Sequence, residues 1–505
     1  MEDRHIRSIV IVGGGTAGWM TAAALARVVG TARCSIRLVE SEEIGTVGVG
    51  EATIPAIHDF NRRLGIDEAA FMRETGATFK LGIEFVNWRR HGDVYMHPFG
   101  SYGRDMNGVS FHHYWTRRRL AGDPADFAEY CLARVAAKLG RFAYPTDDRS
   151  SVYSTYAYAF HLDASRYAQF LRRLAESLGV VRTEGRVVAA QLRASDGHID
   201  HVVLDGGEAI SGELFIDCSG FRGVLIEQAL HTGYTEWQHW LPCDSALALP
   251  TRNVGTMLPH TRAIAHRAGW QWRIPLQHRT GNGHVFSSAH MKCEEAADLL
   301  GRHVEGRALA EPRLLRFVPG KRNRMWNRNC VAIGLSGGFL EPLESTSIFL
   351  IQAAIMKLLE FFPDRDFCSP DIRAFNDSLS QVFDEVRNFV ILHYKATERD
   401  DSEFWRYCRN MVVPDELDYR MRLFRERGVA SHRKGELFIE ANWVAVYVGQ
   451  GIVPEAYDPR ADCLGAEDLR VRLAEMRAHV RKAAVAMSGH DAVLSRCCAA
   501  PDEVD

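Results

Sequence analysis

The chain has 505 residues, of which 46% are hydrophobic and 25% are charged, and its formal net charge is −3. These values are typical of a soluble enzyme with two or three packed lobes, and they favour neither nucleic acid nor an anionic membrane as a partner. No apolar run is long enough to span a bilayer. The eleven cysteines include no CxxC pair, so neither zinc nor a disulfide framework is expected, and the cytoplasm is the default location.

A glycine-rich turn near the start of the chain connects an expected strand to an expected helix. The run Ile9–Val12 is apolar and largely β-branched, as in a strand buried on both faces of a parallel sheet, and it leaves no room for a signal peptide. Gly13, Gly15 and Gly18 follow at G-x-G-x-x-G spacing, and an Ala-rich helix is expected next. Such glycines permit a tight turn, close approach of a pyrophosphate and close helix–strand packing.

A second expected strand, residues 35–39, ends at Glu40, which lies 22 positions beyond Gly18. An acid at this distance from the glycines binds a ribose hydroxyl in dinucleotide-binding folds. The pattern therefore predicts a dinucleotide, either FAD or NAD(P).

Helical and strand patterns alternate along the rest of the chain. Helices are expected at 56–64, 68–75 and 163–178, the last with Asp163 as its N-cap, and strands at 79–85, 180–191, 198–204 and 214–220. The strands at 180–191 and 198–204 are expected to form a small sheet. Residues from 365 onward are expected to be mainly helical.

Two segments have compositions that fit a ligand pocket. Residues 44–55 hold three glycines in six positions and are either backbone wrapped round a ligand or a flexible loop. Residues 91–115 are rich in aromatic side chains and histidines, but no carboxylate or cysteine joins them at ligand spacing, so no metal is expected there. By position alone, Lys80 is expected to be a surface lysine.

A second strand–glycine–helix arrangement lies between residues 331 and 362. Its helix begins near Ser347, with Ser345 or Thr346 as a natural N-cap. A helix start offers free N–H groups and a positive potential, so it suits an anion or an electron-rich ring edge. Glu344, just before it, is either a carboxylate that complements the helix dipole or a site acid.

Four motifs together resemble the flavin-dependent tryptophan halogenase family. They are GGGTAGW at 13–19, GVGEATIP at 48–55, GWQWRIP at 269–275 and GGFLEPLEST at 337–346. HYKATERDDSEFW at 393–405 and GQGIVPEAYDP at 449–459 are also similar to it. The W-x-W-x-I-P element separates this family from related flavin monooxygenases.

The resemblance implies an α/β fold, in which a Rossmann-like, flavin monooxygenase-type FAD module packs against a largely helical substrate lobe. The expected division is a core of residues 1–360 and a C-terminal lobe of residues 361–505. The positions that would bind FAD are Gly13, Gly14, Gly15, Thr16, Ala17, Gly18, Glu40, Val49, Glu51, Ala52, Val187, Asp217, Leu335 and Ile348.

The resemblance also implies a reaction. Reduced FAD from a separate reductase, together with O2, would convert a halide into hypohalous acid, which would pass through a tunnel to a lysine beside an arene. The lysine would be Lys80, with Glu344 as its partner carboxylate and catalytic acid–base group. A halide would be held at Thr346 and Ser347. The substrate would contact His97, Phe99 and Phe438, and the tunnel and its barrier would be formed by Trp270, Trp272, Ile274, Pro275 and Ser345.

One segment departs from the family pattern. Members that act on free tryptophan carry a tyrosine pair with following acids, whereas residues 423–438 contain no tyrosine pair. Phe438 stands where those members have a tryptophan that stacks on the substrate. Indole, or a larger indole-like or phenolic compound, is therefore the expected substrate.

The leading hypothesis is thus a halogenase that installs chloride or bromide on an electron-rich arene. A FAD monooxygenase or oxidase, a free-tryptophan halogenase and a catalytically silent flavin module remain as alternatives. No nucleic acid, membrane or metal is expected as a partner, and a homodimer is left open.

Overall fold

The computed structural model describes residues 4–43 and 50–501. Its contacts divide the chain into two units, each built from three stretches. Unit 1 comprises Met1–Gly76, Leu162–Gln238 and Arg316–Asp384, and unit 2 comprises Ala77–His161, His239–Leu315 and Glu385–Asp505. The expected boundary at residue 360 separates the chain by function and not into compact units, and it stays a prediction.

Unit 1 is built on a six-stranded sheet. Its order is β21 (Trp326–Asn327), β22 (Cys330–Ala332), β13 (Leu214–Asp217), β1 (Ser8–Val12), β2 (Ser35–Glu40) and β9 (Val181–Glu184). All neighbouring strands are parallel except β21 and β22. Residues 9–12 of β1 and 214–216 of β13 are all apolar, as expected for strands covered on both faces, and the region around Val12, Val39 and Phe215 forms a buried core.

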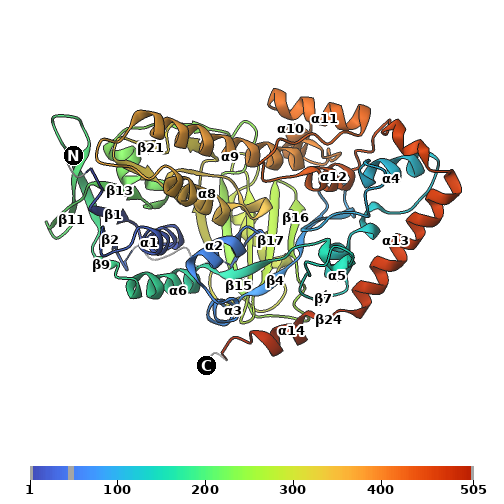
Figure 1. Cartoon of the computed structure of the whole chain (residues 1–505), viewed down its shortest axis with the longest axis horizontal. Helices are drawn as coiled ribbons and strands as arrows, with labels where there is room; N and C mark the ends of the chain where they lie inside the picture. Colours follow the sequence, from blue (N-terminus) through green and yellow to red (C-terminus); the bar gives the residue numbers. More distant parts are fainter. Residues whose placement is uncertain (1–3, 44–49, 502–505) are drawn as a thin grey trace. The chain divides into compact units, whose positions relative to one another are not determined.

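Helices and small sheets complete unit 1. α1 (Thr16–Val28) follows the glycine turn and packs against α6 (Ala164–Ser177) and α8 (Ser347–Glu360), and Figure 1 shows it beside β1 and β2. The remaining elements are β3 (Gly50–Ala52), α2 (Ile57–Leu64), α3 (Glu68–Thr75), β10 (Val187–Leu192), β11 (Ile199–Leu204), β12 (Ala209–Ser211), β14 (Tyr234–Glu236), β20 (Gly320–Arg322), β23 (Gly338–Phe339) and the first part of α9 (Ser369–Lys395). The Asp163 carboxylate caps α6, as predicted, by accepting bonds from the amides of Ser165 and Arg166.

The strand expected at 180–191 is wrong in one respect. The chain breaks at Gly185, so that β9 pairs with β2 in the main sheet and only β10 joins β11 in the small one. The amide of Gly185 donates to the carbonyl of Glu40 at 2.9 Å. The first half of the segment therefore pairs with a strand 144 positions earlier in the chain, which a local pattern does not reveal.

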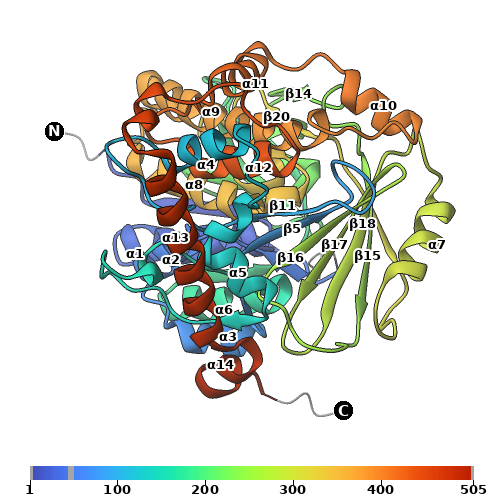
Figure 2. The ribbon, with the colours of Figure 1, turned by 90° about the vertical axis from the view of Figure 1, so that its right-hand side faces the viewer.

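Unit 2 contains a seven-stranded sheet. Its order is β19 (Arg313–Arg316), β15 (Ser245–Thr251), β18 (Thr280–Phe286), β17 (Gly269–Pro275), β16 (Thr261–His266), β5 (Gly82–Val86) and β6 (Val94–Pro98). Figure 2 shows these strands side by side, with α7 (Cys293–His303) next to β15 and β18. The single strand expected at 79–85 is wrong, because β4 (Thr78–Lys80) pairs with β8 (Ala159–Asp163) rather than joining this sheet.

The other elements of unit 2 are mostly helical, in agreement with the prediction for residues beyond 365. They are α4 (Phe111–Leu120), α5 (Leu132–Lys138), β7 (Arg141–Phe142), α10 (Glu403–Asn410), α11 (Asp415–Arg427), α12 (Glu440–Gly449), α13 (Ala466–Ala486), β24 (Ser488–Gly489) and α14 (His490–Cys497). Across residues 4–43 and 50–501, no helix combines the length and the apolar character needed to cross a bilayer.

Candidate functional site

The glycine turn of unit 1 has no space for side chains. A Cβ added to Gly13, whose φ is +112°, would lie 2.3 Å from the carbonyl oxygen of Cys218. A Cβ on Gly18 would lie 1.8 Å from the carbonyl oxygen of Gly13, and one on Gly14 would lie 1.5 Å from a Glu40 oxygen. The turn therefore brings bare backbone to the carboxyl ends of β1 and β13, where open α/β sheets bind their ligands.

The start of α1 fits a phosphate group. Gly15 is its N-cap residue and offers no side chain, and the first turn contains no acidic residue. The first amides of the helix are thus available, together with the positive end of its dipole. Glu40 lies beside this turn, where its carboxylate accepts hydrogen bonds from Trp19 Nε1 at 3.2 Å and from Arg182 Nε at 2.5 Å.

Neighbouring strand ends complete this part of unit 1. The turn after β22 packs directly on α1, since a Cβ on Gly334 would lie 2.8 Å from the Cβ of Ala17. This packing places Leu335 near the glycine turn. Asp217 is fully buried, and four donors saturate its carboxylate: the amides of Ser219, Leu225 and Ile226 and the Ser219 hydroxyl. Asp217 therefore orders its own loop, and a direct contact between its side chain and a cofactor would require these bonds to change.

The other residues expected at a dinucleotide site have fewer contacts that connect them to the glycine turn. Val187 and Ala52 are buried, Glu51 is half-buried in β3, and Thr16 donates from its hydroxyl to the Ala164 carbonyl at 3.5 Å. Val49 and the rest of the expected loop at 44–49 lie outside the described residues. The bare glycine backbone, the open helix start and the carboxylate at the end of β2 fit FAD, and the roles of individual residues stay predictions.

The segment before α8 forms a second open helix start. Glu344, Ser345 and Thr346 are each at most 2% exposed, and Ser345 adopts a left-handed conformation with φ +59°. Thr346 occupies the N-cap position, as predicted, but its hydroxyl caps no amide and has no hydrogen-bond partner. Ser347 and Ile348 thus present backbone amides at the positive end of a 14-residue helix without an acidic residue in its first turn. Such a helix start can hold an anion.

In unit 2, Lys80 is fully buried, so its expected place on the surface is wrong. Its ammonium lies 5.0 Å from the centre of the Phe99 ring. The two residues meet because the Phe99 amide donates to the Leu81 carbonyl at 2.8 Å, in line with the pairing of β5 and β6. Gly82 permits this approach, because a Cβ there would lie 2.4 Å from the His97 carbonyl oxygen.

The charge of Lys80 lowers the pKa of a nearby histidine. Burial first, and then the positive charge of Lys80, hold the pKa of His161 well below its usual value. His161 is hydrogen-bonded to the Thr78 and Thr261 hydroxyls at 2.8 and 3.0 Å. The buried surroundings of Lys80 are therefore organised by polar contacts from three strands.

Aromatic side chains gather around His97. Phe438 stacks on Phe389 with ring centres 3.8 Å apart, and these rings lie 6.2 and 5.4 Å from the His97 ring. The Asn442 amide contacts His97 Nε2 at 2.9 Å and fixes the ring. The indole group of Trp443 packs edge-on against Phe389 at 5.0 Å. We call His97, Phe389, Phe438, Asn442 and Trp443 the aromatic cluster.

The W-x-W-x-I-P element lies in strand β17. Trp270 and Trp272 lie on the same face with ring centres 6.2 Å apart, and both are at most 7% exposed. Trp272 pairs with Gly283 on β18, where a Cβ would lie 2.0 Å from its ring. At the end of the element, the Pro275 carbonyl accepts a bond from the Thr78 hydroxyl at 2.7 Å. The element, which also includes buried Ile274, is therefore tied to the strand that carries Lys80.

A buried ion pair lies next to the aromatic cluster. The Arg420 guanidinium lies 5.0 Å from the Trp443 ring centre and contacts both carboxylate oxygens of Glu436, one of them at 3.0 Å. Burial alone would raise the pKa of Glu436, but the Arg420 hydrogen bonds lower it below its usual value. The two charges satisfy one another, so neither is free to bind a charged ligand.

Within unit 2 the structure places Lys80 against Phe99 and His97 beside Phe438, and all four residues were predicted from the sequence. The prediction missed Phe389 and Asn442. Asn442 is separated from His97 by 345 positions, and its contact with His97 has no local sequence signal. Among the described residues, no group of His, Cys, Asp and Glu side chains has the arrangement of a metal site.

Known proteins match this chain over nearly its whole length. A family model described as tryptophan halogenase matches residues 8–466. The tryptophan 6-halogenase SttH of Streptomyces toxytricini is 38% identical over 448 residues, which cover 83% of this chain and 84% of SttH.

Two solved structures extend the match to the fold. Xcc4156, a flavin-dependent halogenase from Xanthomonas campestris, is 49% identical with a TM-score of 0.95 and covers 99% of both chains. BrvH, a flavin-dependent halogenase from Brevundimonas sp. BAL3, is 46% identical with a TM-score of 0.95 and covers 98% of this chain and 100% of its own. The predicted FAD-binding α/β fold and the assignment as an enzyme are thereby confirmed. The chain belongs to the tryptophan halogenase family.

Proposed function

We propose that this protein is a FADH2- and O2-dependent halogenase that installs bromide or chloride on an indole-type arene. The observation that carries the proposal is the buried Lys80, whose ammonium faces the Phe99 ring in the unit that also holds the aromatic cluster. A fully buried ammonium is costly, and a functional role accounts for its retention.

Bound reduced FAD would supply, with O2, the two-electron oxidation that converts a halide into hypohalous acid. The glycine turn and the first amides of α1 would hold its pyrophosphate, and Glu40 would bind its ribose. We infer that a separate reductase supplies FADH2, because the chain has one G-x-G-x-x-G fingerprint and no second one for a nicotinamide cofactor. A reducing cytoplasm fits this supply and the eleven free cysteines, all in the described part of the chain.

The halide would sit at the start of α8. Two backbone amides, of Ser347 and Ile348, and the unpartnered Thr346 hydroxyl would solvate it in place of water. The helix dipole favours an anion at this point.

Lys80 would hold hypohalous acid by donating a hydrogen bond to its oxygen. The ring carbon then attacks the halogen, the oxygen–halogen bond breaks, and hydroxide leaves as water after taking a proton from the ammonium. Glu344 would accept the proton that the ring loses, which restores aromaticity. Trp270 and Trp272, with Ile274, Pro275 and Ser345, would keep the arene away from the oxidising cofactor.

The aromatic cluster supports indole rather than free tryptophan. His97 and Phe438 offer ring faces, and the ion pair beside Trp443, Arg420 with Glu436, is already satisfied. An amino acid would need its ammonium and carboxylate paired with protein charges, or they would be buried at high cost. We therefore expect a higher kcat/KM for indole than for tryptophan.

The experiment is mass spectrometry of products formed from indole and from tryptophan, with reductase, NADH and either halide. Halogenated indole that forms faster than halogenated tryptophan supports the proposal. A kcat/KM clearly higher for tryptophan would overturn the substrate assignment. Hydroxylated product formed without halide would instead identify a monooxygenase.

A further inference from the structure

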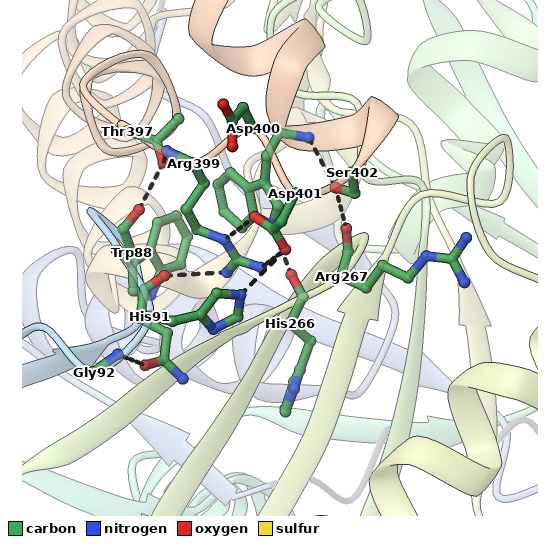
Figure 3. Close-up of polar contacts among 12 residues, drawn as sticks. Trp88, His91, Gly92, His266, Arg267, Thr397, Arg399, Asp400, Asp401 and Ser402 are labelled. Carbon is green, nitrogen blue, oxygen red and sulfur yellow. Dashed lines mark hydrogen bonds and ion pairs between the residues drawn. The ribbon is translucent and has the colours of Figure 1, made fainter.

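The segment 397–405, the second half of the motif at 393–405, forms a polar cluster around the buried Arg399. We call Thr397, Arg399, Asp401, Ser402 and Trp405 the Arg399 cluster. Figure 3 shows that the side chains of Arg399 and Asp401 meet between two turns of unit 2. One turn joins β5 to β6, and the other joins β16 to β17.

The cluster is bonded to the turn between β5 and β6. Arg399 Nη1 donates to the Asn87 carbonyl at 3.1 Å, and the Thr397 hydroxyl donates to the Trp88 carbonyl at 2.7 Å. His91 Nε2 lies 3.2 Å from an Asp401 oxygen (Figure 3). Asn87 itself adopts a positive φ of 63°, so its carbonyl is held in a fixed, unusual direction.

The same cluster is bonded to the turn between β16 and β17. The Ser402 hydroxyl donates to the Arg267 carbonyl at 2.7 Å, as Figure 3 shows. The indole Nε1 of Trp405 donates to the His266 carbonyl at 2.7 Å. Arg399 lies over the Trp405 ring, 4.5 Å from its centre, so the guanidinium and the indole fix one another.

These two turns lead to the strands that carry the proposed substrate and barrier residues. β6 runs from the first turn to His97, and β17 runs from the second turn through Trp270 and Trp272. The indole of Trp88, in the first turn, packs 5.7 Å from Trp405 and 6.4 Å from Trp270. A displacement of the cluster would therefore reach both strands through packed side chains and backbone hydrogen bonds.

The Arg399–Asp401 pair is built for rigidity. The Arg399 side chain is 2% exposed, and its Nε and Nη2 bond the two oxygens of Asp401 at 2.9 and 2.8 Å. The Arg399 hydrogen bonds lower the pKa of Asp401 below its usual value. A bidentate pair restricts rotation of both groups. The Asp401 side chain is 35% exposed, and an ion pair with a partly exposed carboxylate adds little to stability. Stability alone thus gives a weak reason for an arginine at this position.

We propose that Arg399 is a positioning residue for halogenation. It fixes the position of the two turns relative to one another, so that His97 and the Trp270–Trp272 pair keep their orientation. The inference rests on the proposed function. Loosening the turns would let hypohalous acid escape before it reacts with the arene.

The test uses the full-length enzyme with Arg399→Met, Arg399→Lys and the matched control Arg117→Met. Arg117 is also largely buried and bonds one carboxylate and two carbonyls, those of Asp462, Ala461 and Leu464, in another part of unit 2. Added free methionine reports escaped hypobromous acid, because its sulfur takes up the oxygen to give the sulfoxide and the bromine is reduced to bromide, with release of one proton. We expect Arg399→Met to raise the ratio of methionine sulfoxide to bromoindole about tenfold, with partial rescue in Arg399→Lys and no change in Arg117→Met.

Hydrogen exchange gives a readout that needs no activity. In Arg399→Met, we expect peptides covering residues 87–98 and 264–275 to exchange about tenfold faster, while other strands of the sheet stay protected. Thr397→Val should loosen mainly the first segment and Ser402→Ala mainly the second, because each removes the bond from one hydroxyl to one turn. Each also removes an acceptor within the cluster, for the Arg399 amide and the Trp405 amide respectively. The two variants separate local positioning from global unfolding.

The outcomes separate the two proposals. If the wild-type enzyme forms no halogenated indole, the proposed function fails, and the exchange data still decide whether Arg399 positions the two turns. If wild type is active but Arg399→Met keeps the wild-type product ratio, or exchange rises equally in every strand, the positioning role is wrong.

Discussion

Replacing Lys80 by methionine separates function from stability at the proposed site. Methionine keeps the length of the apolar stem and removes the charge. Since Lys80 is fully buried, the substitution leaves little empty space.

The substitution should change turnover far more than stability. Burying an ammonium costs several kcal/mol, and its buried contacts, which include the Phe99 ring at 5.0 Å, offset part of that cost. We therefore expect the free energy of unfolding of Lys80→Met to stay within about 2 kcal/mol of the wild-type value. Loss of the group that holds the electrophile should lower kcat by about 10²–10³, or about 3–4 kcal/mol.

The assay measures bromoindole formation with reductase, NADH and bromide, alongside flavin titration and urea unfolding. Lys482→Met, an exposed lysine on α13, is the matched control and should behave as wild type. FAD affinity should be unchanged in both variants, and Lys80→Ala should also abolish halogenation.

Turnover of Lys80→Met within a few-fold of wild type, with unchanged regiochemistry, would refute the mechanism. Lower stability together with retained turnover would show that Lys80 serves the fold.

Three further predictions concern other parts of the chain. Glu344→Gln should lower the rate of halogenation by roughly two orders of magnitude and leave FAD affinity unchanged. If Lys80→Met/Glu344→Gln is no slower than the slower of the two single variants, the two residues act together. Gly18→Ala should abolish FAD binding in a flavin titration, because its Cβ would lie 1.8 Å from the Gly13 carbonyl oxygen; normal binding would contradict the expected phosphate turn. Burial lowers the pKa of His490 to about 4, so the unfolded chain takes up this proton first as the pH falls below about 6.5. The free energy of unfolding should therefore fall by about 2 kcal/mol between pH 7 and pH 4.5 through this group alone. Urea unfolding of His490→Gln is the check: if its free energy of unfolding falls as steeply with pH as that of wild type, His490 is not the cause.

Local patterns predicted the dinucleotide end well. Strand, glycine turn and helix between Ser8 and Val28 lie within one stretch, and the close contact of Gly18 with the Gly13 carbonyl lies inside it. In β17, Trp270 and Trp272 are two positions apart, so the alternation of a strand by itself puts them on one face.

The burial of Lys80 could not be predicted from local sequence patterns. Nothing in residues 78–86 indicates that the chain leaves one sheet at Lys80 and enters another at Gly82. The burial of Lys80 depends on a hairpin partner at Phe99 and on a strand at Ala159. Sequence resemblance identified the residue, whereas its physical setting required long-range pairing.

The aromatic cluster illustrates the same limit at greater distance. Taken separately, Phe389 and Phe438 look like ordinary apolar residues of helical regions. Their stacking at 3.8 Å and the contact between Asn442 and His97 arise only when α12 packs on β6.

The alternation of the two units along the chain has a consequence for synthesis on the ribosome. The central strand β1 pairs with β2 at once, but its other neighbour, β13, begins at Leu214, and the neighbour of β13 begins at Cys330. A nascent chain that has emerged only to residue 213 therefore exposes one apolar edge of β1 with no strand to cover it. Such edges pair with other chains, so the yield of folded protein should depend on chaperones and on the rate of translation between residues 40 and 332.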